Sequence, residues 1–495
     1  MSARTVLLIS ANRETVPAPV YPGGMARLAG ALQQAGHRVA QFDVLVDSLE
    51  SLPRVLDEMQ PHLAGVSLRN VDNLTSGQPQ SYAPFYREVI RTIRSASSVP
   101  VVLGGSGFSL FPDRFLHELG ADYGIVGPGE QAICSLLEMM DGAVEAGSIP
   151  NLLTASGRSS RSRRTDSPPA ALPEAVFSLH DRRIIDFYWR TGGMIGVQTK
   201  IGCPRSCSYC TYPVIEGRSV CHIDVCQVAG EIERLVSEFG IRYVFFADSL
   251  FNLCREYELS LAGEIRRRGL EFSWGAFFSP SRIDGAYLAE LKRSGLTHVE
   301  FGTDSLCDAM LQSYGKDFRV RDVFAAAAAC SELEIHCAHY IILGGPGEND
   351  GTVLDTMRNA ERLPRSVMFP FSGIRLYPRT DLHAVAVREG VIAPDDDCFE
   401  PRFYEPPGVD LARIWEIVAE AAGHSHHRWV MPTEYASCVG GMKRMRRHGF
   451  KGPLWEYLLH RVDGGARTDG SPANGNGRTQ DGRTQDGRIR GSPLR

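Results

Sequence analysis

Short apolar runs alternate with helical stretches along most of this 495-residue chain, and this alternation restricts the possible folds more than any other feature. It occurs in two series, one over residues 1–150 and one that begins at Met194. Such alternation is typical of a parallel sheet whose strands are joined by crossover helices. Ligands of these sheets bind beyond the carboxyl ends of the strands. The sequence therefore predicts two α/β domains, each with a ligand-binding site at the carboxyl ends of its strands.

The first series predicts a Rossmann-like domain over residues 1–150. Glycine-rich or polar segments follow its expected strands, and glycine lets the backbone approach a large flat or anionic ligand closely. Tight turns alone would also explain these glycines. The expected strands are 5–10, 38–42, 63–68, 99–103 and 123–126, the first helix is 24–35, and the segments are 22–24, 67–70, 104–107 and 127–130.

The second series predicts six βα units within residues 191–395. Six units are enough for a partial barrel, whose functional groups lie at the carboxyl ends of the strands. The expected strands are 195–198, 243–247, 272–278, 299–302, 336–343 and 372–376, with helices such as 226–239 and 286–294 between them.

The remaining segments give weaker signals. Residues 157–169 are polar and basic without apolar periodicity, so we expect a linker, which we extend over 151–190. Residues 396–462 are expected to form a mainly helical C-terminal region. Residues 463–495 contain a tandem Gly-Arg-Thr-Gln-Asp repeat and few apolar side chains, so we expect a disordered tail.

Composition excludes several classes of function. The net charge is −5 and 43% of the residues are apolar, so nothing suggests a nucleic-acid partner and a small-molecule substrate is favoured. No apolar stretch approaches the ~18 residues that a membrane span needs. Twelve cysteines without a compact disulfide framework favour the reducing cytoplasm.

The cysteine run Cys203, Cys207 and Cys210 has the spacing C-x3-C-x2-C. Three thiolates from one loop can hold three irons of a [4Fe–4S] cluster and leave the fourth iron open. A zinc loop is the alternative, but structural zinc sites need four ligands, usually as two separated pairs. No second pair with suitable spacing follows, so the sequence predicts an iron–sulfur centre.

This run, with Tyr209 before its third cysteine, resembles the signature of the radical S-adenosylmethionine (SAM) enzymes. Segments similar to other parts of that family follow at 248–252, 300–305 and 341–348. The resemblance implies a partial (β/α)6 barrel in which SAM chelates the open iron and is cleaved reductively. It assigns cofactor binding to Tyr209, Asp304, Ser305, Gly344 and Gly345.

The first domain resembles the cobalamin-binding domain that is fused to one branch of these enzymes. The family's Asp-x-His-x-x-Gly motif is missing, and the domain's histidines, His37, His62 and His117, lie in other settings. The resemblance therefore implies a cobalt without a histidine ligand and with Arg69 near its lower face, although Arg69 bridging a carboxylate is equally compatible. The residues assigned to cobalamin are Ser67, Arg69, Gly104, Gly105, Gly127, Gly129 and Glu130.

The combined resemblance implies a cobalamin-dependent radical SAM methyltransferase. It would move a methyl group from SAM through methylcobalamin to an unactivated carbon, or a phosphinate phosphorus, of a small biosynthetic intermediate such as an antibiotic precursor. A reductant such as flavodoxin or ferredoxin would supply electrons. The closest alternative is a cyclase or ring-rearranging enzyme with the same cofactors.

Two further alternatives are disfavoured by cysteines. A methylthiotransferase would carry three cysteines in its N-terminal domain, and this one has only Cys134. A non-catalytic cofactor sensor would not need the intact cysteine run. Arg375, on the last expected strand, is predicted either to anchor an anionic substrate or to close the barrel.

Overall fold

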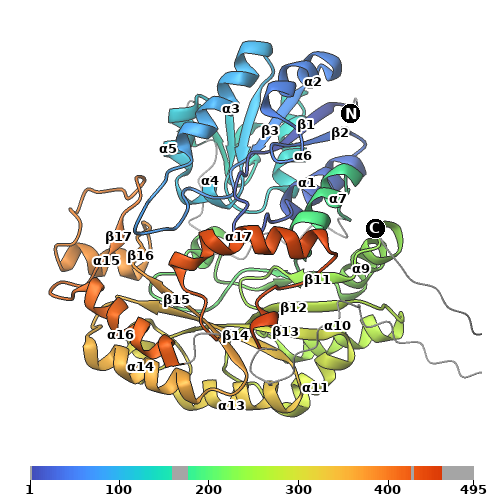
Figure 1. Cartoon of the computed structure of the whole chain (residues 1–495). Helices are drawn as coiled ribbons and strands as arrows, with labels where there is room; N and C mark the ends of the chain where they lie inside the picture. The colour runs from blue at the N-terminus through green and yellow to red at the C-terminus, as the bar shows by residue number, and fades with distance from the viewer. Residues whose placement is uncertain (1–2, 156, 159–176, 425–427, 460–495) are drawn as a thin grey trace, which may run out of the picture.

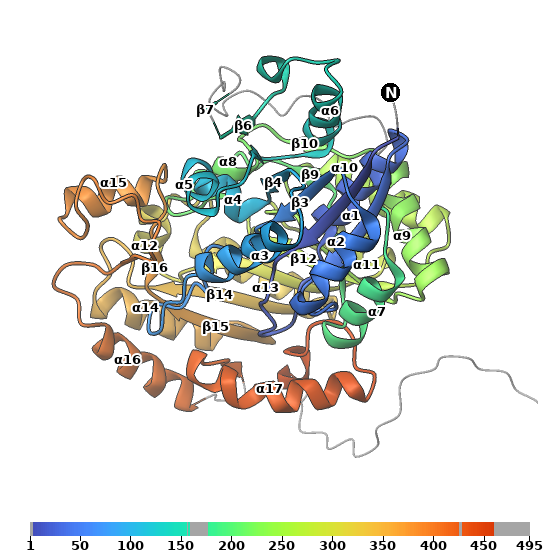
Figure 2. The same cartoon turned by 90° about the horizontal axis from the view of Figure 1, so that it is seen from above.

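The computed structural model describes residues 3–155, 157–158, 177–424 and 428–459. These residues form two α/β units, one above the other, with a helical C-terminal region along one side (Figures 1 and 2). The linker residues 159–176 and the tail expected from residue 463 lie outside the described residues.

The N-terminal unit is built on a seven-stranded sheet in the order β2-β1-β3-β4-β5-β6-β7. Its first five strands are parallel, and β6 and β7 extend the edge in antiparallel fashion. The order reverses between β1 and β3, which is where ligands bind in sheets of this type. The bounds are β1 (Thr5–Ser10), β2 (Arg38–Asp43), β3 (Leu63–Ser67), β4 (Val101–Gly104), β5 (Tyr123–Ile125), β6 (Leu152–Thr154) and β7 (Gly157–Arg158).

Both faces of this sheet are covered by helices. In β1, Val6 and Leu8 belong to one apolar core and Leu7 and Ile9 to another, because successive side chains of a strand point to opposite faces. The expected parallel strands are confirmed to within two residues. The helices are α1 (Gly23–Gln34), α2 (Leu52–Met59), α3 (Ala83–Ala96), α4 (Ser106–Leu110), α5 (Pro112–Leu119) and α6 (Glu130–Met140), with short 3-10 turns at Leu49–Ser51 and Ala146–Ser148.

The second unit is the partial barrel that the sequence predicted. Six parallel strands stand in the order β15-β14-β13-β12-β11-β8, with helices on the outside (Figure 1). The strands are β8 (Ile195–Val197), β11 (Tyr243–Phe246), β12 (Ser273–Phe278), β13 (Leu296–Asp304), β14 (His336–Leu343) and β15 (Ser366–Ser372), and the helices are α9 (Val225–Phe239), α10 (Arg255–Arg267), α11 (Gly285–Arg293), α12 (Asp308–Ser313), α13 (Val320–Glu332) and α14 (Asp350–Arg362).

The prediction of the sixth strand at 372–376 was wrong. The sheet ends with β15 at Ser366–Ser372, and Ile374–Arg375 instead form β16, which pairs with β17 (Phe403–Tyr404). Pro370 lies inside β15 opposite Ile341. A proline cannot donate a ladder hydrogen bond, and it is tolerated here because β15 is an edge strand.

The two units are joined by buried polar contacts. Arg375 donates from Nε to Asp72 Oδ2 at 2.7 Å, and both side chains are buried. Arg375 therefore joins the barrel to the N-terminal unit, a role that neither sequence alternative had named. On α7 (Arg182–Thr191), Tyr188 donates to Asp43 Oδ2 at 3.0 Å. The segment expected to be a linker thus contains an ordered helix, and it also contains β6 and β7.

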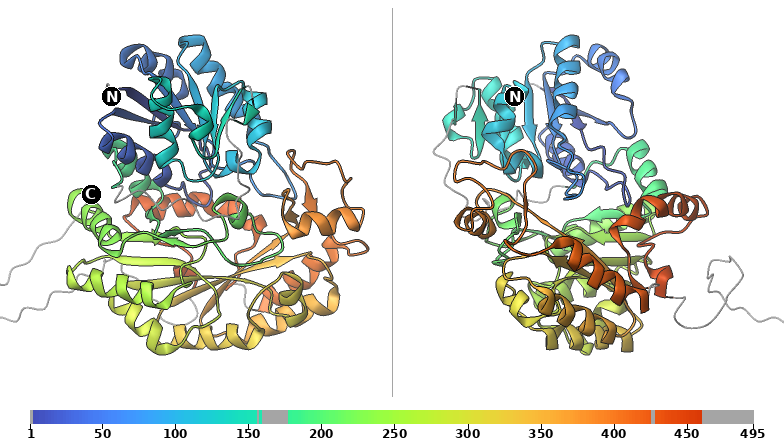
Figure 3. Two further views of the ribbon diagram at one scale, coloured as in Figure 1. Left: turned by 180° about the vertical axis from the view of Figure 1, so that it is seen from behind. Right: turned by 60° about the vertical axis from the view of Figure 1, so that its left-hand side comes forward.

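The C-terminal region is mainly helical, as expected. Helix α16 packs its apolar side chains against α14, and α17 follows it along the same side of the molecule (Figure 2). Figure 3 shows the same two-unit arrangement from behind and from one side. No helix among the described residues combines the length and apolar composition that crossing a membrane requires. The helices are α15 (Asp381–Arg388), α16 (Leu411–His424), α17 (Pro432–Arg447) and α18 (Glu456–Leu459).

Candidate functional site: an inter-unit cavity beside a cysteine loop

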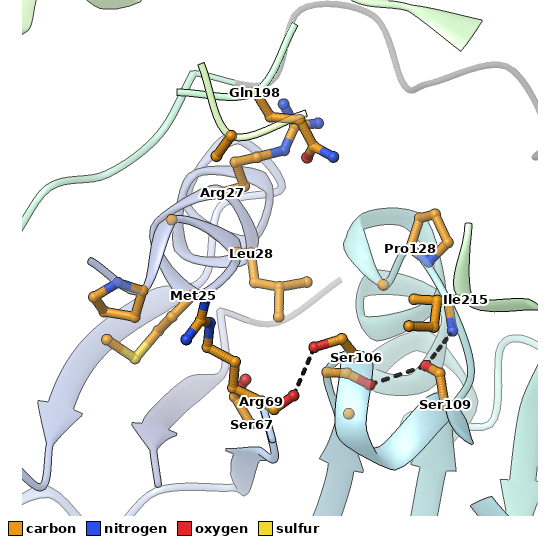
Figure 4. A pocket seen from close by; sticks show the side chains of 18 of the residues that line it. Met25, Arg27, Leu28, Ser67, Arg69, Ser106, Ser109, Pro128, Gln198 and Ile215 are labelled. Atoms are coloured by element: carbon orange, nitrogen blue, oxygen red, sulfur yellow. Dashed lines mark hydrogen bonds between the residues drawn. The ribbon is translucent and has the colours of Figure 1, made fainter. Parts of the chain in front are cut away.

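A cavity of about 590 Å³ lies between the carboxyl ends of the N-terminal strands and the first barrel strands. Its wall is shared by both units (Figure 4). All seven residues that the sequence assigned to the first cofactor site line it: Ser67, Arg69, Gly104, Gly105, Gly127, Gly129 and Glu130.

Two of the predicted glycines are needed for the shape of the wall. Gly105 has φ +98°, and a Cβ there would lie 2.7 Å from the Leu68 carbonyl oxygen. Gly127 has φ +76°, a conformation that L side chains rarely adopt. Ser109 Oγ donates to the Gly105 carbonyl and accepts from the Gly127 amide, both at 2.9 Å. Sequence reasoning missed Ser109, whose only signal is its position one helical turn after Gly105.

The Arg69 side chain extends across the cavity toward Met25 on α1 (Figure 4). Its guanidinium makes no hydrogen bond or ion pair with any described residue, while its carbonyl oxygen accepts from Ser106 Oγ at 2.8 Å. Desolvation by burial lowers the pKa of Arg69, and Glu14 opposes this. The expected alternative, a carboxylate bridge, is not present among the described residues, so the cation remains available to a ligand.

Glu130, by contrast, already has a partner. Its Oε1 accepts from Arg27 Nε at 2.9 Å, and the Glu130 side chain is 9% exposed. This contact joins the start of α6 to α1. Glu130 therefore shapes the cavity wall.

Histidine ligands from the N-terminal unit are absent from the described cavity wall. The lining does include His180, which lies outside that unit's strands and helices. Its Nδ1 is 2.7 Å from the Tyr21 hydroxyl and its Nε2 is 2.7 Å from Glu231 Oε1. The Nδ1 of His180 is therefore hydrogen-bonded within the protein, while its Nε2 lies beside the Glu231 carboxylate without a well-aligned hydrogen bond.

The cysteine loop begins after β9 (Lys200–Ile201), beside the cavity. Cys203, Cys207 and Cys210 are all free thiols. The loop is held by backbone hydrogen bonds from Cys203 to Gly217 and from Cys210 to Cys207. Burial raises the pKa of Cys210 to about 12, so the thiol is neutral without a metal and releases its proton when a metal binds.

Two buried polar atoms in the same loop have no partner among the described residues. They are Arg205 Nε and Ser208 Oγ. An unsatisfied buried donor costs about 1–3 kcal/mol, and a group bound in the loop would provide the missing acceptors. Three thiols with two unpaired donors fit a [4Fe–4S] cluster, whose inorganic sulfides accept hydrogen bonds.

Tyr209, Asp304 and Lys316 form a buried cluster beside the loop. The Tyr209 hydroxyl donates to Asp304 Oδ2, and the Lys316 ammonium contacts the same oxygen. Burial lowers the pKa of Lys316, but Asp304 and then Cys207 raise it overall. Asp304 has φ +59°. Sequence reasoning missed Lys316, since only the fold brings it to Asp304.

The other residues assigned to SAM lie at the same strand ends. Ser305 Oγ is 3.0 Å from Thr356 Oγ1 and accepts from the Cys307 amide. A Cβ at Gly345 would lie 2.2 Å from the Tyr314 ring, and Gly344 has φ +81°. None of these residues lines the cavity. The structure places them beside the cysteine loop instead, where the side-chain hydroxyl of Ser305 is already hydrogen-bonded.

Glu216 is a cavity-lining carboxylate that the sequence did not reveal. Its Oε2 accepts from the Gly202 amide at 3.0 Å, and Gln198 Nε2 approaches Oε1 at 3.4 Å. Burial raises the pKa of Glu216 to about 7. Glu216 can therefore hold or release a proton near neutral pH. Glu216 directly follows the short helix α8 (Tyr212–Ile215), which comes after the third cysteine. The strand β10 (Cys221–His222) then pairs with β9.

Two family models match the chain, one after the other along the sequence. The B12 binding domain matches residues 9–137, and the Radical SAM superfamily matches residues 197–360. These ranges contain the cavity glycines and the cysteine loop, respectively.

Relatives and solved structures agree with these matches. The chain is 26% identical to tryptophan 2-C-methyltransferase of Streptomyces laurentii, over 76% of this chain and 73% of the relative. It is 26% identical to the anaerobic magnesium-protoporphyrin IX monomethyl ester cyclase of Cereibacter sphaeroides, over 68% and 56% of the two chains. The structure of the methyltransferase TsrM from Kitasatospora setae, with cobalamin and a [4Fe–4S] cluster bound, superposes with TM-score 0.80 at 24% identity, covering 93% of this chain and 98% of that one.

Because the sequence identity to TsrM is only 24%, the likeness establishes the fold alone, in which the same two domains follow one another. The matched domains, the cysteine loop and the cavity that both units line agree with one another. The chain belongs to the cobalamin-dependent radical SAM enzymes, the branch of the radical SAM superfamily with a B12 binding domain ahead of the barrel.

Proposed function

We propose that the protein transfers a methyl group from SAM, by way of cobalamin, to a small biosynthetic intermediate. The observation that carries this proposal is the single cavity lined by the glycine loops of the B12 binding domain and by residues next to the cysteine loop. Methyl transfer requires the methyl carrier and the acceptor to meet in one space that excludes water. The relatives from Streptomyces laurentii and Kitasatospora setae are both methyltransferases, which supports the same chemistry.

The chain's own residues divide the work between the two cofactors. Cys203, Cys207 and Cys210 would hold the cluster, and the strand-end glycines with Ser67 would hold cobalamin. When bound, cobalamin supplies a cobalt centre that accepts and passes on a methyl group, and the cluster supplies the electron that cleaves SAM. Arg69 offers a cation without a partner among the described residues, and it would contact bound cobalamin.

Glu216 has the position and the pKa to move a proton. Its carboxyl lines the cavity and is held by the Gly202 amide, and its pKa of about 7 is close to the value that general acid–base catalysis favours. When the methyl group replaces an acceptor hydrogen that leaves as a proton, we assign Glu216 to accept that proton.

The acceptor is proposed to be a small molecule with an unactivated carbon, and tryptophan derivatives form the first panel because the Streptomyces relative acts on tryptophan. A flavodoxin or ferredoxin is proposed as the reductant, and the cytoplasm as the location. We also propose that the enzyme acts in an antibiotic biosynthesis pathway.

The test is anaerobic turnover of the reconstituted enzyme with SAM that carries a CD3 methyl group. Mass spectrometry of the product should show the intact labelled methyl group. A variant with all three cysteines replaced by alanine is the control, and it should give no labelled product. Formation of 5′-deoxyadenosine together with a product that lacks the label would contradict methyl transfer and support the cyclase alternative.

A further inference from the structure

A second group of metal-ligating side chains lies at the amino-terminal ends of the barrel strands, opposite to the strand ends that carry the cysteine loop. His298 is near the start of β13, and His336 is the first residue of β14, directly beside it in the register. Glu456 begins α18 in the C-terminal region. The three side chains offer ligand atoms that all lie within 4.8 Å of one another. Three elements that are distant in the sequence therefore converge on one point.

The distances suit one shared ion. Glu456 Oε2 is 3.1 Å from His298 Nε2 and 3.7 Å from His336 Nε2. Nitrogen and oxygen ligands at about 2.0–2.2 Å from a tetrahedral zinc ion are separated from one another by about 3.3–3.6 Å. Small side-chain adjustments bring the three atoms to these separations. The side chains of His336 and Glu456 are 20% and 16% exposed, so water can reach the fourth position.

The surroundings of His298 favour a metal-binding tautomer. Its Nδ1 lies 3.0 Å from the Tyr243 hydroxyl and 2.8 Å from Thr297 Oγ1. When Nδ1–H donates to one of these oxygens, Nε2 carries a free lone pair directed at Glu456, and partners of this kind fix the orientation of metal-binding histidines. The ring is also packed against His336 and Trp455, with centroids 5.2 and 5.3 Å away. His298 is therefore held in place before any ion binds.

We propose that His298, His336 and Glu456 bind one zinc ion that fastens the C-terminal segment to the barrel. Two imidazoles and one carboxylate form a donor set that zinc accepts readily. The ion would close a contact across 158 residues of sequence between His298 and Glu456. Because it binds the folded chain, it would stabilise the fold by an amount that grows with the logarithm of its free concentration above the dissociation constant. The site takes no part in methyl transfer, so this inference does not depend on the proposed function.

The competing explanation needs no metal: His298 Nε2–H donates to the Glu456 carboxylate as an ordinary hydrogen bond. The first test is the zinc content of the full-length holoprotein, expressed with zinc and measured by elemental analysis after gel filtration. We expect about one zinc per chain. The variants Glu456→Gln and His336→Asn should lose it, and the exposed control Glu400→Gln should keep it.

The cysteine loop is a possible second place for zinc when its cluster is incomplete, so the measurement is repeated on the Cys203, Cys207 and Cys210 triple alanine variant. Zinc should remain, and a chelator should then lower the melting temperature of this variant. X-ray absorption at the zinc edge should show nitrogen and oxygen neighbours without sulfur, a readout that does not require the site variants to fold. A zinc-free protein whose melting temperature does not respond to added zinc would overturn the proposal, as would sulfur neighbours or equal zinc content in Glu456→Gln and the wild type.

Discussion

The two cofactor regions differ in how far their polar groups are already engaged. At the N-terminal strand ends, Arg69 faces the cavity with no partner among the described residues. At the barrel strand ends, the Asp304 carboxylate is bound by Tyr209 and Lys316, and Ser305 is bound by Thr356. The first region keeps a charged group free for a ligand. The second is a preassembled network that holds the cysteine loop in place.

This difference predicts that substitutions in the two regions separate function from stability. A residue without a protein partner can be replaced at little cost to folding, while one member of a buried ion pair cannot.

The largest effect should come from the cysteine loop. Replacing Cys203, Cys207 and Cys210 by alanine should abolish binding of about four irons and remove reductive SAM cleavage, because three thiolates are the anchor of the cluster. Iron analysis and the absorption near 400 nm would measure this. The exposed Cys226 provides the control, since Cys226→Ala should retain full iron. Iron retained by the triple variant would mean that the cluster lies elsewhere.

Lys316→Met should destabilise the fold strongly. The Lys316 and Asp304 side chains are 8% and 4% exposed, and removal of one partner leaves a buried charge without compensation, which costs about 3–5 kcal/mol. Chemical denaturation would give the change in the free energy of unfolding. The exposed Arg358, paired with Asp355, is the matched control, because Arg358→Met should cost less than about 1 kcal/mol. Similar costs for the two variants would remove the distinction between the regions.

Glu216→Gln should change the pH dependence of stability. Because burial places the folded-state pKa of Glu216 at about 7, above its usual 4.5, the neutral carboxyl is favoured in the folded protein. Its contribution is complete below pH 4.5 and is lost as the pH rises through about 7. The wild type should therefore lose up to about 3 kcal/mol relative to Glu216→Gln across this window. Parallel stability profiles of the two proteins from pH 4 to pH 8 would show that the carboxyl titrates normally.

Arg69→Met should have the smallest effect on stability and a clear effect on function. We expect the free energy of unfolding to change by less than about 0.5 kcal/mol, since the guanidinium has no partner in the part of the chain that the structure describes. Cobalamin-dependent turnover should fall by roughly tenfold, as expected for loss of a charged contact to a ligand. The half-exposed Arg87 is the control for loss of a surface charge. A large loss of stability with unchanged turnover would give Arg69 a structural role.

The sequence predicted the strand ends well because local signals mark them. The glycines at 104, 105, 127 and 129 follow apolar runs that are buried strands in the structure. It failed at β15 because Pro370 breaks the local strand signal and only the position at the sheet edge makes it acceptable.

The residues that sequence reasoning missed depend on tertiary contacts. Lys316 meets Asp304, and Asp72 is the partner, across the unit boundary, of Arg375, which the sequence had singled out without this role. Glu216 acquires its raised pKa through burial. None of these environments leaves a pattern in the local sequence, so only the fold could reveal them.

The central claim is that the cavity holds cobalamin without a histidine on the cobalt, beside Arg69. Electron paramagnetic resonance of the Co(II) form of the reconstituted protein tests it most directly. We predict a spectrum without superhyperfine splitting from an axial nitrogen, because His180, the one histidine among the described cavity-lining residues, has its Nδ1 hydrogen-bonded to Tyr21 and its Nε2 2.7 Å from Glu231 Oε1. Splitting from an axial nitrogen that disappears in His180→Ala would contradict the account.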